Sequence, residues 1–239
     1  MQRHSFVLIA GAWHGAWCWA KVAPLLESQG HHVLALELPA TGADSSDPAD
    51  VTLESWARFV AQSLLDQPRP VTLVGHSRAG VVISRAAELA PERLRLLVYL
   101  SAYLLPNGVA LAEAARSDRD SLVPPNMIPA QGGVTCRLDP AVIRSALFGH
   151  CSDADYEFAL TRMSAEPLKP LVSPLKVTTQ RFGSVPRAYI ECLQDRTVTL
   201  PAQRRMQAQL PCDPVLTLDS DHSPFLSHPE ELARLLGGL

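Results

Sequence analysis

The fold of this chain is decided by Val71-Thr72-Leu73-Val74-Gly75-His76-Ser77-Arg78-Ala79-Gly80, which continues into Val81-Val82-Ile83-Ser84-Arg85-Ala86-Ala87. A β-branched apolar run stops at a Gly-His-Ser turn, and an apolar helical pattern begins directly after it. A tight strand-to-helix turn of this kind holds a serine hydroxyl clear of the backbone, where it can serve as a nucleophile. The stretch therefore predicts a strand, a turn that carries Ser77, and a helix.

The turn departs from the usual G-x-S-x-G pattern at one position. Ala79 stands where the pattern has its second glycine, and Gly80 follows immediately. Glycine is favoured there because the turn is strained and the helix passes close to neighbouring backbone. One methyl group takes up some room and adds no polarity, so we interpret Ala79 as a tolerated variant. The motif by itself is weak, and its weight comes from the rest of the chain.

Composition limits the class of protein. The 239 residues are 47% hydrophobic and 19% charged, which is typical of a globular domain, and we expect one domain over residues 1–239. The net charge is −3 with both signs interspersed, which gives no electrostatic footprint for nucleic acid or anionic membrane. No apolar run approaches transmembrane length. A small-molecule partner is expected, and the sequence does not decide between a monomer and a homodimer.

The cysteines, histidines and glycines give no cofactor signature. The five cysteines are Cys18, Cys136, Cys151, Cys192 and Cys212. They are odd in number and form no C-x-x-C pair, which indicates reduced thiols in a cytoplasm rather than disulfides or a zinc site. No histidine pair has metal-ligand spacing, and G-x-G-x-x-G is absent. The apolar run at residues 6–10 is too short for a signal peptide. We expect no metal or cofactor and a cytoplasmic location.

Short apolar runs alternate with longer helical patterns. The runs lie at residues 6–10, 32–38, 71–74, 94–101, 186–192 and 214–218. The helical patterns lie at residues 17–29, 53–65, 78–90, 202–209 and 230–236. Near-continuous apolar strands separated by helices are typical of a parallel sheet that is covered on both faces. We therefore predict an α/β fold with a mainly parallel sheet of about six strands flanked by helices.

Residues 103–182 break this alternation. They combine irregular stretches rich in Pro, Gly and Met with two short helical patterns at residues 140–148 and 153–163. We expect this segment to be a helical and irregular cap inserted into the domain. Its apolar residues are consistent with an apolar substrate pocket, although core packing explains them equally well: Met127, Ile128, Leu147, Phe148 and Phe158.

A serine nucleophile needs a histidine to take its proton and an acid to orient that histidine. Asp195 follows the strand at residues 186–192, and His222 follows the strand at residues 214–218. Carboxyl ends of parallel strands lie at one edge of a sheet, so we expect Ser77, Asp195 and His222 to converge there. Asp219 and Asp221 are rival acids. Asp221 is a poor candidate, because adjacent side chains on an extended segment point apart.

Acyl transfer also needs two donors for the oxyanion of its transition state. These are usually the backbone N–H after the nucleophile and one from the loop after the first core strand, here those of Arg78 and Ala12. The loop over residues 10–17 contains small residues and glycine, which lets backbone approach a ligand closely. Gly11 and Trp13 in this loop are expected to contact substrate.

Taken together, these motifs make the chain resemble the plant methylesterase and hydroxynitrile lyase family of α/β-hydrolases. The matching stretches are residues 11–19, residues 30–38 with Thr41-Gly42, the Gly75-His76-Ser77 turn, residues 189–195, and Ser220-Asp221-His222. The resemblance implies an α/β-hydrolase fold without a cofactor. It also implies Ser77 as nucleophile, His222 as general base and acid, Asp195 as its orienting acid, and Ala12 and Arg78 as oxyanion donors.

Departures from the family separate its two activities. The lyase branch has a threonine where this chain has Gly11 and a lysine where it has Ser223, so the resemblance implies an esterase. Glu37 replaces the usual aspartate, which bears on loop geometry only. We predict a serine-dependent carboxylic ester hydrolase that acts on small to medium, largely apolar esters through an acyl-enzyme. The alternatives are a hydroxynitrile lyase on the same scaffold and a binding protein that has lost turnover.

Overall fold

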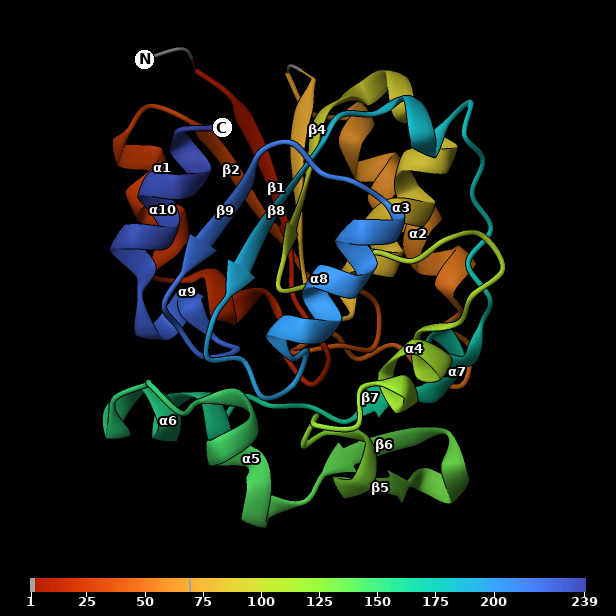
Figure 1. Cartoon of the computed structure of the whole chain (residues 1–239), viewed down its shortest axis with the longest axis vertical. Helices are drawn as coiled ribbons and strands as arrows, with labels where there is room; N and C mark the ends of the chain where they lie inside the picture. The colour runs from red at the N-terminus through yellow and green to blue at the C-terminus, as the bar shows by residue number, and fades with distance from the viewer. Residues whose placement is uncertain (1–2, 69) are drawn as a thin grey trace.

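The computed structural model describes residues 3–68 and 70–239, and its centre is a six-stranded sheet (Figure 1). The strand order is β2-β1-β3-β4-β8-β9, and every pairing is parallel. The strands are β1 (Ser5–Ile9), β2 (His32–Leu36), β3 (Val71–His76), β4 (Leu94–Leu100), β8 (Arg187–Cys192) and β9 (Val215–Leu218). The parallel sheet expected from the alternation of apolar runs and helices is confirmed.

Helices cover both faces of the sheet (Figure 1). The strand β1 shows the alternation, because Val7 and Ile9 join one core while Phe6 and Leu8 join the other. The first core also contains residues of α2 (Leu53–Leu65), α3 (Ala79–Leu89) and α8 (Leu200–Gln209). The second contains residues of α1 (Val22–Ser28) and α10 (Pro229–Gly237). Burial on both faces explains why these strands read as continuous apolar runs.

The prediction of a single helix over residues 17–29 was wrong at the N-terminal end of that helix. A 3-10 turn at Ala16–Trp19 comes first, and α1 starts only at Val22. Pro24 explains the late start, because proline lacks the N–H that a helix interior requires and is tolerated only in the first turn. Starting at Val22 places Pro24 in that first turn.

The helix α3 starts two residues after the serine, and its packing explains the altered glycine pattern. A Cβ on Gly80 would lie 2.4 Å from the carbonyl oxygen of Tyr103, so this position accepts no side chain. Ala79 is fully buried, with its methyl group inside the first core. The backbone contact that demands glycine therefore falls on residue 80 in this chain.

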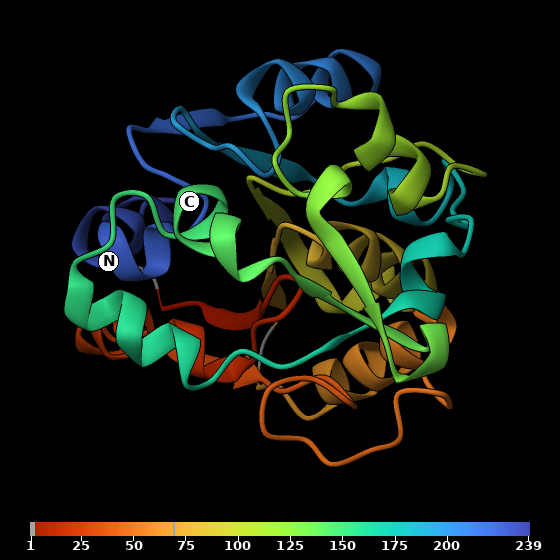
Figure 2. The same cartoon turned by 90° about the horizontal axis from the view of Figure 1, so that it is seen from below.

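Residues 103–182 are hereafter called the cap segment. Residues 111–172 lie across the carboxyl end of the sheet (Figures 1 and 2), and the segment then runs back beside α3, where the N–H of Thr178 donates to Glu88. The segment contains four α-helices, α4 (Leu111–Ser117), α5 (Pro140–Leu147), α6 (Asp153–Leu160) and α7 (Leu168–Val172). The two helical patterns expected here correspond to α5 and α6. Both end earlier than expected, at Leu147 and Leu160.

The cap segment also contains a small antiparallel sheet that the sequence did not predict. Its strands β5 (Met127–Ala130), β6 (Thr135–Leu138) and β7 (Glu166–Pro167) pair in the order β5-β6-β7. Strands this short show almost no periodicity, and Pro129 argues against a strand in sequence. The structure tolerates Pro129 because β5 is an edge strand.

Across residues 3–68 and 70–239, no helix combines the length and the apolar content needed to cross a bilayer. Over the same residues, no group of three or more His, Cys, Asp and Glu side chains is arranged to hold a metal ion. All five cysteines are free thiols, and four of them are buried.

Candidate active site

The turn between β3 and α3 holds Ser77 in a strained conformation. Its φ is 53°, in the left-handed region that non-glycine residues rarely adopt. The Ser77 N–H donates to the carbonyl oxygen of Leu100 at 3.2 Å, and its own carbonyl oxygen accepts from the N–H of Tyr103 at 3.1 Å. Strained backbone persists where the surrounding structure enforces it. These two bonds tie the turn to the end of β4 and hold Ser77 in place.

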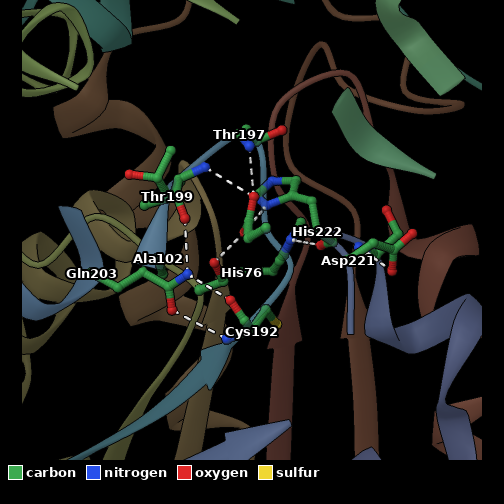
Figure 3. Close-up of polar contacts among 12 residues, drawn as sticks. His76, Ala102, Cys192, Thr197, Thr199, Gln203, Asp221 and His222 are labelled. Carbon is green, nitrogen blue, oxygen red and sulfur yellow. Dashed lines mark hydrogen bonds and ion pairs between the residues drawn. The ribbon is translucent and has the colours of Figure 1, made fainter. Parts of the chain in front are cut away.

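Asp195 and His222 are in direct contact. They lie in the loops after β8 and β9, and the Nδ1 of His222 donates to the Oδ2 of Asp195 at 2.6 Å (Figure 3). Both side chains are buried. The other carboxylate oxygen accepts the N–H groups of Thr197 at 2.6 Å and Val198 at 3.0 Å, and the hydroxyl of Ser101 donates to Oδ2. Three hydrogen-bond donors besides His222 thus fix the position of the carboxylate, and the carboxylate in turn fixes the orientation of the imidazole ring.

His76 connects the His222 loop to the serine turn. Its Nε2 donates to the carbonyl oxygen of His222 at 2.8 Å, and the two rings lie 4.5 Å apart (Figure 3). Among the described residues, no hydrogen bond joins the hydroxyl of Ser77 to Nε2 of His222. The structure therefore brings Asp195 and His222 into contact and anchors them beside the residue that precedes Ser77. Such serine–histidine bonds are often long without substrate and tighten when it binds.

The two rival acids are engaged elsewhere. The carboxylate of Asp221 accepts the N–H of His150 at 2.9 Å and the hydroxyl of Ser227 at 2.8 Å. Asp219 accepts from the side-chain amide of Gln194 at 2.9 Å. Of these three carboxylates, the one that contacts the ring of His222 is that of Asp195.

The loop after β1 packs against the serine turn. A Cβ on Gly11 would lie 2.9 Å from the Cβ of Ser77 and 2.7 Å from Nδ1 of His76, so the close approach depends on glycine. The backbone N–H groups of Ala12 and Arg78 have no hydrogen-bond acceptor among residues 3–68 and 70–239. Two uncommitted donors thus flank the serine.

Ser77, Ala12 and Arg78 line one cavity of about 210 Å³. Most of its other lining residues are apolar and come from the cap segment, including Leu111, Ala115, Val123, Met127, Leu168 and Leu171. Trp13 lines the cavity, whereas Gly11 is not among its lining residues.

Most of the apolar cap residues singled out in the sequence lie elsewhere. Met127 lines the cavity, but Leu147 and Phe148 are buried in the second core. Ile128 is exposed, and Phe158 packs against Trp17. For these four residues, packing and surface placement explain the apolar side chains.

Sequence reasoning gave little weight to several residues that support the site. His14 donates from Nδ1 to the carbonyl oxygen of Ala12 at 2.7 Å. Burial lowers the pKa of His14 to about 4 and the pKa of His76 well below its ordinary value, so both rings are neutral at neutral pH. For Ser101, which donates to Asp195, the only indication in the sequence was its position at the end of a predicted strand. For Glu166, which contacts Arg78, nothing in the sequence indicated a role at the site.

With this geometry in view, comparison with known proteins defines the class. The model of the alpha/beta hydrolase family matches residues 6–235, and the chain belongs to that family.

The similar curated proteins include plant esterases and one lyase. Polyneuridine aldehyde esterase of Rauvolfia serpentina is 30% identical over 98% of this chain and 95% of its own length. A solved structure of polyneuridine aldehyde esterase superposes with a TM-score of 0.86 at 30% identity, covering 98% of each chain. The alpha-hydroxynitrile lyase of Arabidopsis thaliana is also 30% identical, over 97% of this chain and 95% of its own.

A third relative is longer than this chain. Putative methylesterase 11, chloroplastic, of Arabidopsis thaliana is 30% identical over 99% of this chain, which spans 64% of that protein. The similarity to esterases across the whole chain supports a hydrolase, as the resemblance of its motifs implied.

Proposed function

We propose that this protein is a serine-dependent carboxylic ester hydrolase that works through an acyl-enzyme. The observation that carries the proposal is the arrangement around the cavity. Ser77 and the two residues with uncommitted N–H groups, Ala12 and Arg78, line one cavity, and a buried Asp195–His222 pair is anchored beside the residue that precedes Ser77. A nucleophile, a proton carrier and an oxyanion site are the three parts that acyl transfer requires.

In the first half of the reaction, Ser77 Oγ forms a bond to the ester carbonyl carbon while its proton passes to Nε2 of His222. The carbonyl oxygen becomes an oxyanion, which accepts from the N–H groups of Ala12 and Arg78. The bond to the alcohol oxygen then breaks, and His222 returns the proton to that oxygen. Asp195 stabilises the imidazolium that forms between the two transfers.

In the second half, a water molecule takes the place of the alcohol. Its proton passes to His222 as its oxygen attacks the acyl carbon. The bond to Ser77 breaks, the serine recovers its proton from His222, and the acid leaves. The apolar cavity of about 210 Å³ favours small to medium, largely apolar esters as the small-molecule partner.

A panel of p-nitrophenyl and methyl esters with increasing acyl size tests this function and its size limit. Ser77→Ala is expected to lower kcat by at least about 10³-fold without loss of folding, because the remaining groups supply only binding and oxyanion stabilisation. Ser63→Ala on α2 is the matched control, since that hydroxyl donates to its own helix at Val60. Full activity in Ser77→Ala would refute the proposal.

Two alternatives are separated by direct assays. Lyase activity is tested by incubation with mandelonitrile and detection of cyanide. Gly11 argues against it, because this site has no room for the side chain that the lyase branch carries there. A binding protein without turnover would not react with a fluorophosphonate, whereas rapid labelling of Ser77 supports the esterase.

The remaining assignments are proposals from the sequence. We propose one domain over residues 1–239 with the cap segment inserted in it, and a cytoplasmic location in keeping with five free thiols. Size-exclusion chromatography with light scattering would decide between a monomer and a homodimer.

A further inference from the structure

A buried ion pair lies next to the serine turn and outside the Ser77, Asp195 and His222 set. Nε of Arg78 is 2.9 Å from Oε1 of Glu166, and the side chains are only 2% and 1% exposed. Arg78 follows the serine, whereas Glu166 belongs to β7 of the cap segment. Burial raises the pKa of the Glu166 carboxyl, and the Arg78 charge opposes that rise. Removing two charges from water costs several kcal/mol per ion. We therefore ask which parts of the site the pair holds in place.

Arg78 reaches the loop that carries one of the two uncommitted N–H groups. Its Nη2 donates to the carbonyl oxygen of Gly11 at 3.0 Å. That carbonyl and the N–H of Ala12 belong to one planar trans peptide group and point in opposite directions. The guanidinium therefore sets the direction of the Ala12 N–H. Its charge also polarises the peptide, which strengthens the N–H as a donor.

Glu166 holds the next peptide group of the same loop. Its Oε2 accepts the backbone N–H of Trp13 at 3.2 Å. Trp13 has a φ of 62°, a strained value for a bulky residue, which persists only where the surrounding structure enforces it. Ser164 adds a second bond from the cap segment, because its N–H donates to the carbonyl oxygen of Trp13 at 3.1 Å. Both peptide groups that flank Ala12 are thus held from outside the loop.

We propose that the Arg78 side chain and Glu166 are positioning residues that aim the Ala12 N–H at the oxyanion of the tetrahedral intermediate. The inference rests on the proposed esterase function and adds a side-chain role to Arg78 beyond its backbone N–H. It also makes the cap segment part of the oxyanion site, because Glu166 comes from β7. Cap placement and oxyanion binding are then coupled through one buried carboxylate.

The test uses the double variant Arg78→Met/Glu166→Gln in the full-length protein. Arg78→Met alone would leave Glu166 buried and unpaired, which is strongly destabilising, whereas the double variant removes both charges together. The amide oxygen introduced by Glu166→Gln can still accept the Trp13 N–H, so the variant removes the ion pair and the bond from Arg78 to Gly11 and keeps an acceptor for Trp13. The control is Arg85→Met, which breaks the ion pair between Arg85 of α3 and Glu54 of α2, away from the loop.

We expect kcat for p-nitrophenyl butyrate to fall about 10- to 100-fold in the double variant, with KM changed less than about threefold. Loss of an entire oxyanion donor costs about 10²- to 10³-fold, and a misdirected donor costs less. Affinity for a trifluoromethyl ketone, which forms an oxyanion on Ser77, should fall by the same factor. Affinity for the matching methyl ketone should not change. Arg85→Met should alter none of these values.

Unchanged kcat and unchanged trifluoromethyl ketone affinity in a folded double variant would overturn the positioning role, whatever the loss in Tm. Failure of the proposed function is distinguished by the wild-type protein, which would then neither hydrolyse esters nor react with a fluorophosphonate. Hydrogen exchange over residues 10–16 tests the positioning role without activity. The double variant should exchange at least about tenfold faster there than Arg85→Met, and equal rates would refute the role.

Discussion

Ser77, Trp13 and Ser101 share a backbone feature, with φ values of 53°, 62° and 40°. Positive φ at a non-glycine residue costs on the order of 1–3 kcal/mol and persists only where neighbours over-determine it. Ser77 is held by the end of β4, and Trp13 is held by Glu166. The N–H of Ser101 donates to Ile190 at 2.9 Å, while its hydroxyl donates to Asp195. Among the described residues, three of the five non-glycine residues with positive φ therefore lie at the site, and the other two are Ala40 and Gln131.

The contact between Asp195 and His222 leads to a prediction about which acid serves the histidine. Asp195→Asn is expected to lower kcat by about 10⁴-fold, because an amide no longer holds the imidazole in the productive tautomer. Asp221→Asn should leave kcat within about threefold, because Asp221 bonds to His150 and Ser227 instead. Steady-state kinetics on one ester checks both variants. A larger loss in Asp221→Asn would reassign the acid.

The helix α3 begins so close to the first residue of the cap segment that the backbone there leaves no room for a methyl group on Gly80. Gly80 meets the backbone of Tyr103, which cannot yield as a flexible side chain would. Ala79 points into the first core and is fully buried. The helix therefore needs its glycine one position later than the usual pattern, and it gains a better helix former at residue 79.

Exchanging these small residues tests that account of α3. Gly80→Ala is expected to lower the free energy of unfolding by about 2 kcal/mol or more, since overpacking against backbone costs about 1–3 kcal/mol. Ala79→Gly restores the usual pattern and should still destabilise, by at most about 1 kcal/mol, through lost helix propensity. Urea denaturation measures both values. A stabilised Ala79→Gly would show that Ala79 is strained rather than tolerated.

Buried aromatic rings from the sheet, the cap segment and the C-terminal region contact one another around His14. The ring of His14 lies 5.5 Å from Phe148 of the cap segment and 5.6 Å from Phe225 of α9 (Pro224–Ser227). It also lies 6.1 Å from His76 at the end of β3. Protonation of His14 would place a charge where these parts of the chain meet, with Arg78 nearby.

This burial predicts how stability depends on pH. The folded pKa of His14 is about 4, against an ordinary value of 6.5, mainly because burial penalises the charged ring. Between these values the unfolded chain binds more protons than the folded chain, so stability falls as pH falls. His14 contributes about 3 kcal/mol to this loss in the free energy of unfolding, and its contribution is complete near pH 4. The lowered pKa of His76 acts in the same direction.

Urea unfolding measured from pH 7.5 to 4.5 checks this dependence. His14→Gln keeps a donor for the Ala12 carbonyl and removes the titrating group, so its stability should fall less steeply over this range. The matched control is His32→Gln, because the His32 side chain is exposed and lies outside this cluster of rings. Identical slopes for the wild type and His14→Gln would contradict the prediction.

Much of this protein can be predicted from local patterns. The alternation of apolar runs and helices predicted the parallel sheet, because strands buried on both faces need continuous apolar sequence. Placement directly after strands predicted that Asp195 and His222 would meet, since the carboxyl ends of parallel strands share one edge. The 3-10 turn at Ala16–Trp19 and the strands of the cap segment escaped prediction, because elements of two to four residues carry almost no periodicity.

Local sequence patterns were enough to predict the parallel sheet with helices between its strands, and they supplied the three residues proposed for proton transfer and attack. The contact between Glu166 and Arg78, and the bond from Arg78 to the peptide group before Ala12, could be seen only in the folded chain. The physical reason lies in the range of the interactions. Periodicity and turn chemistry act between near neighbours, whereas a buried ion pair between a cap strand and a helix start exists only after the chain has folded.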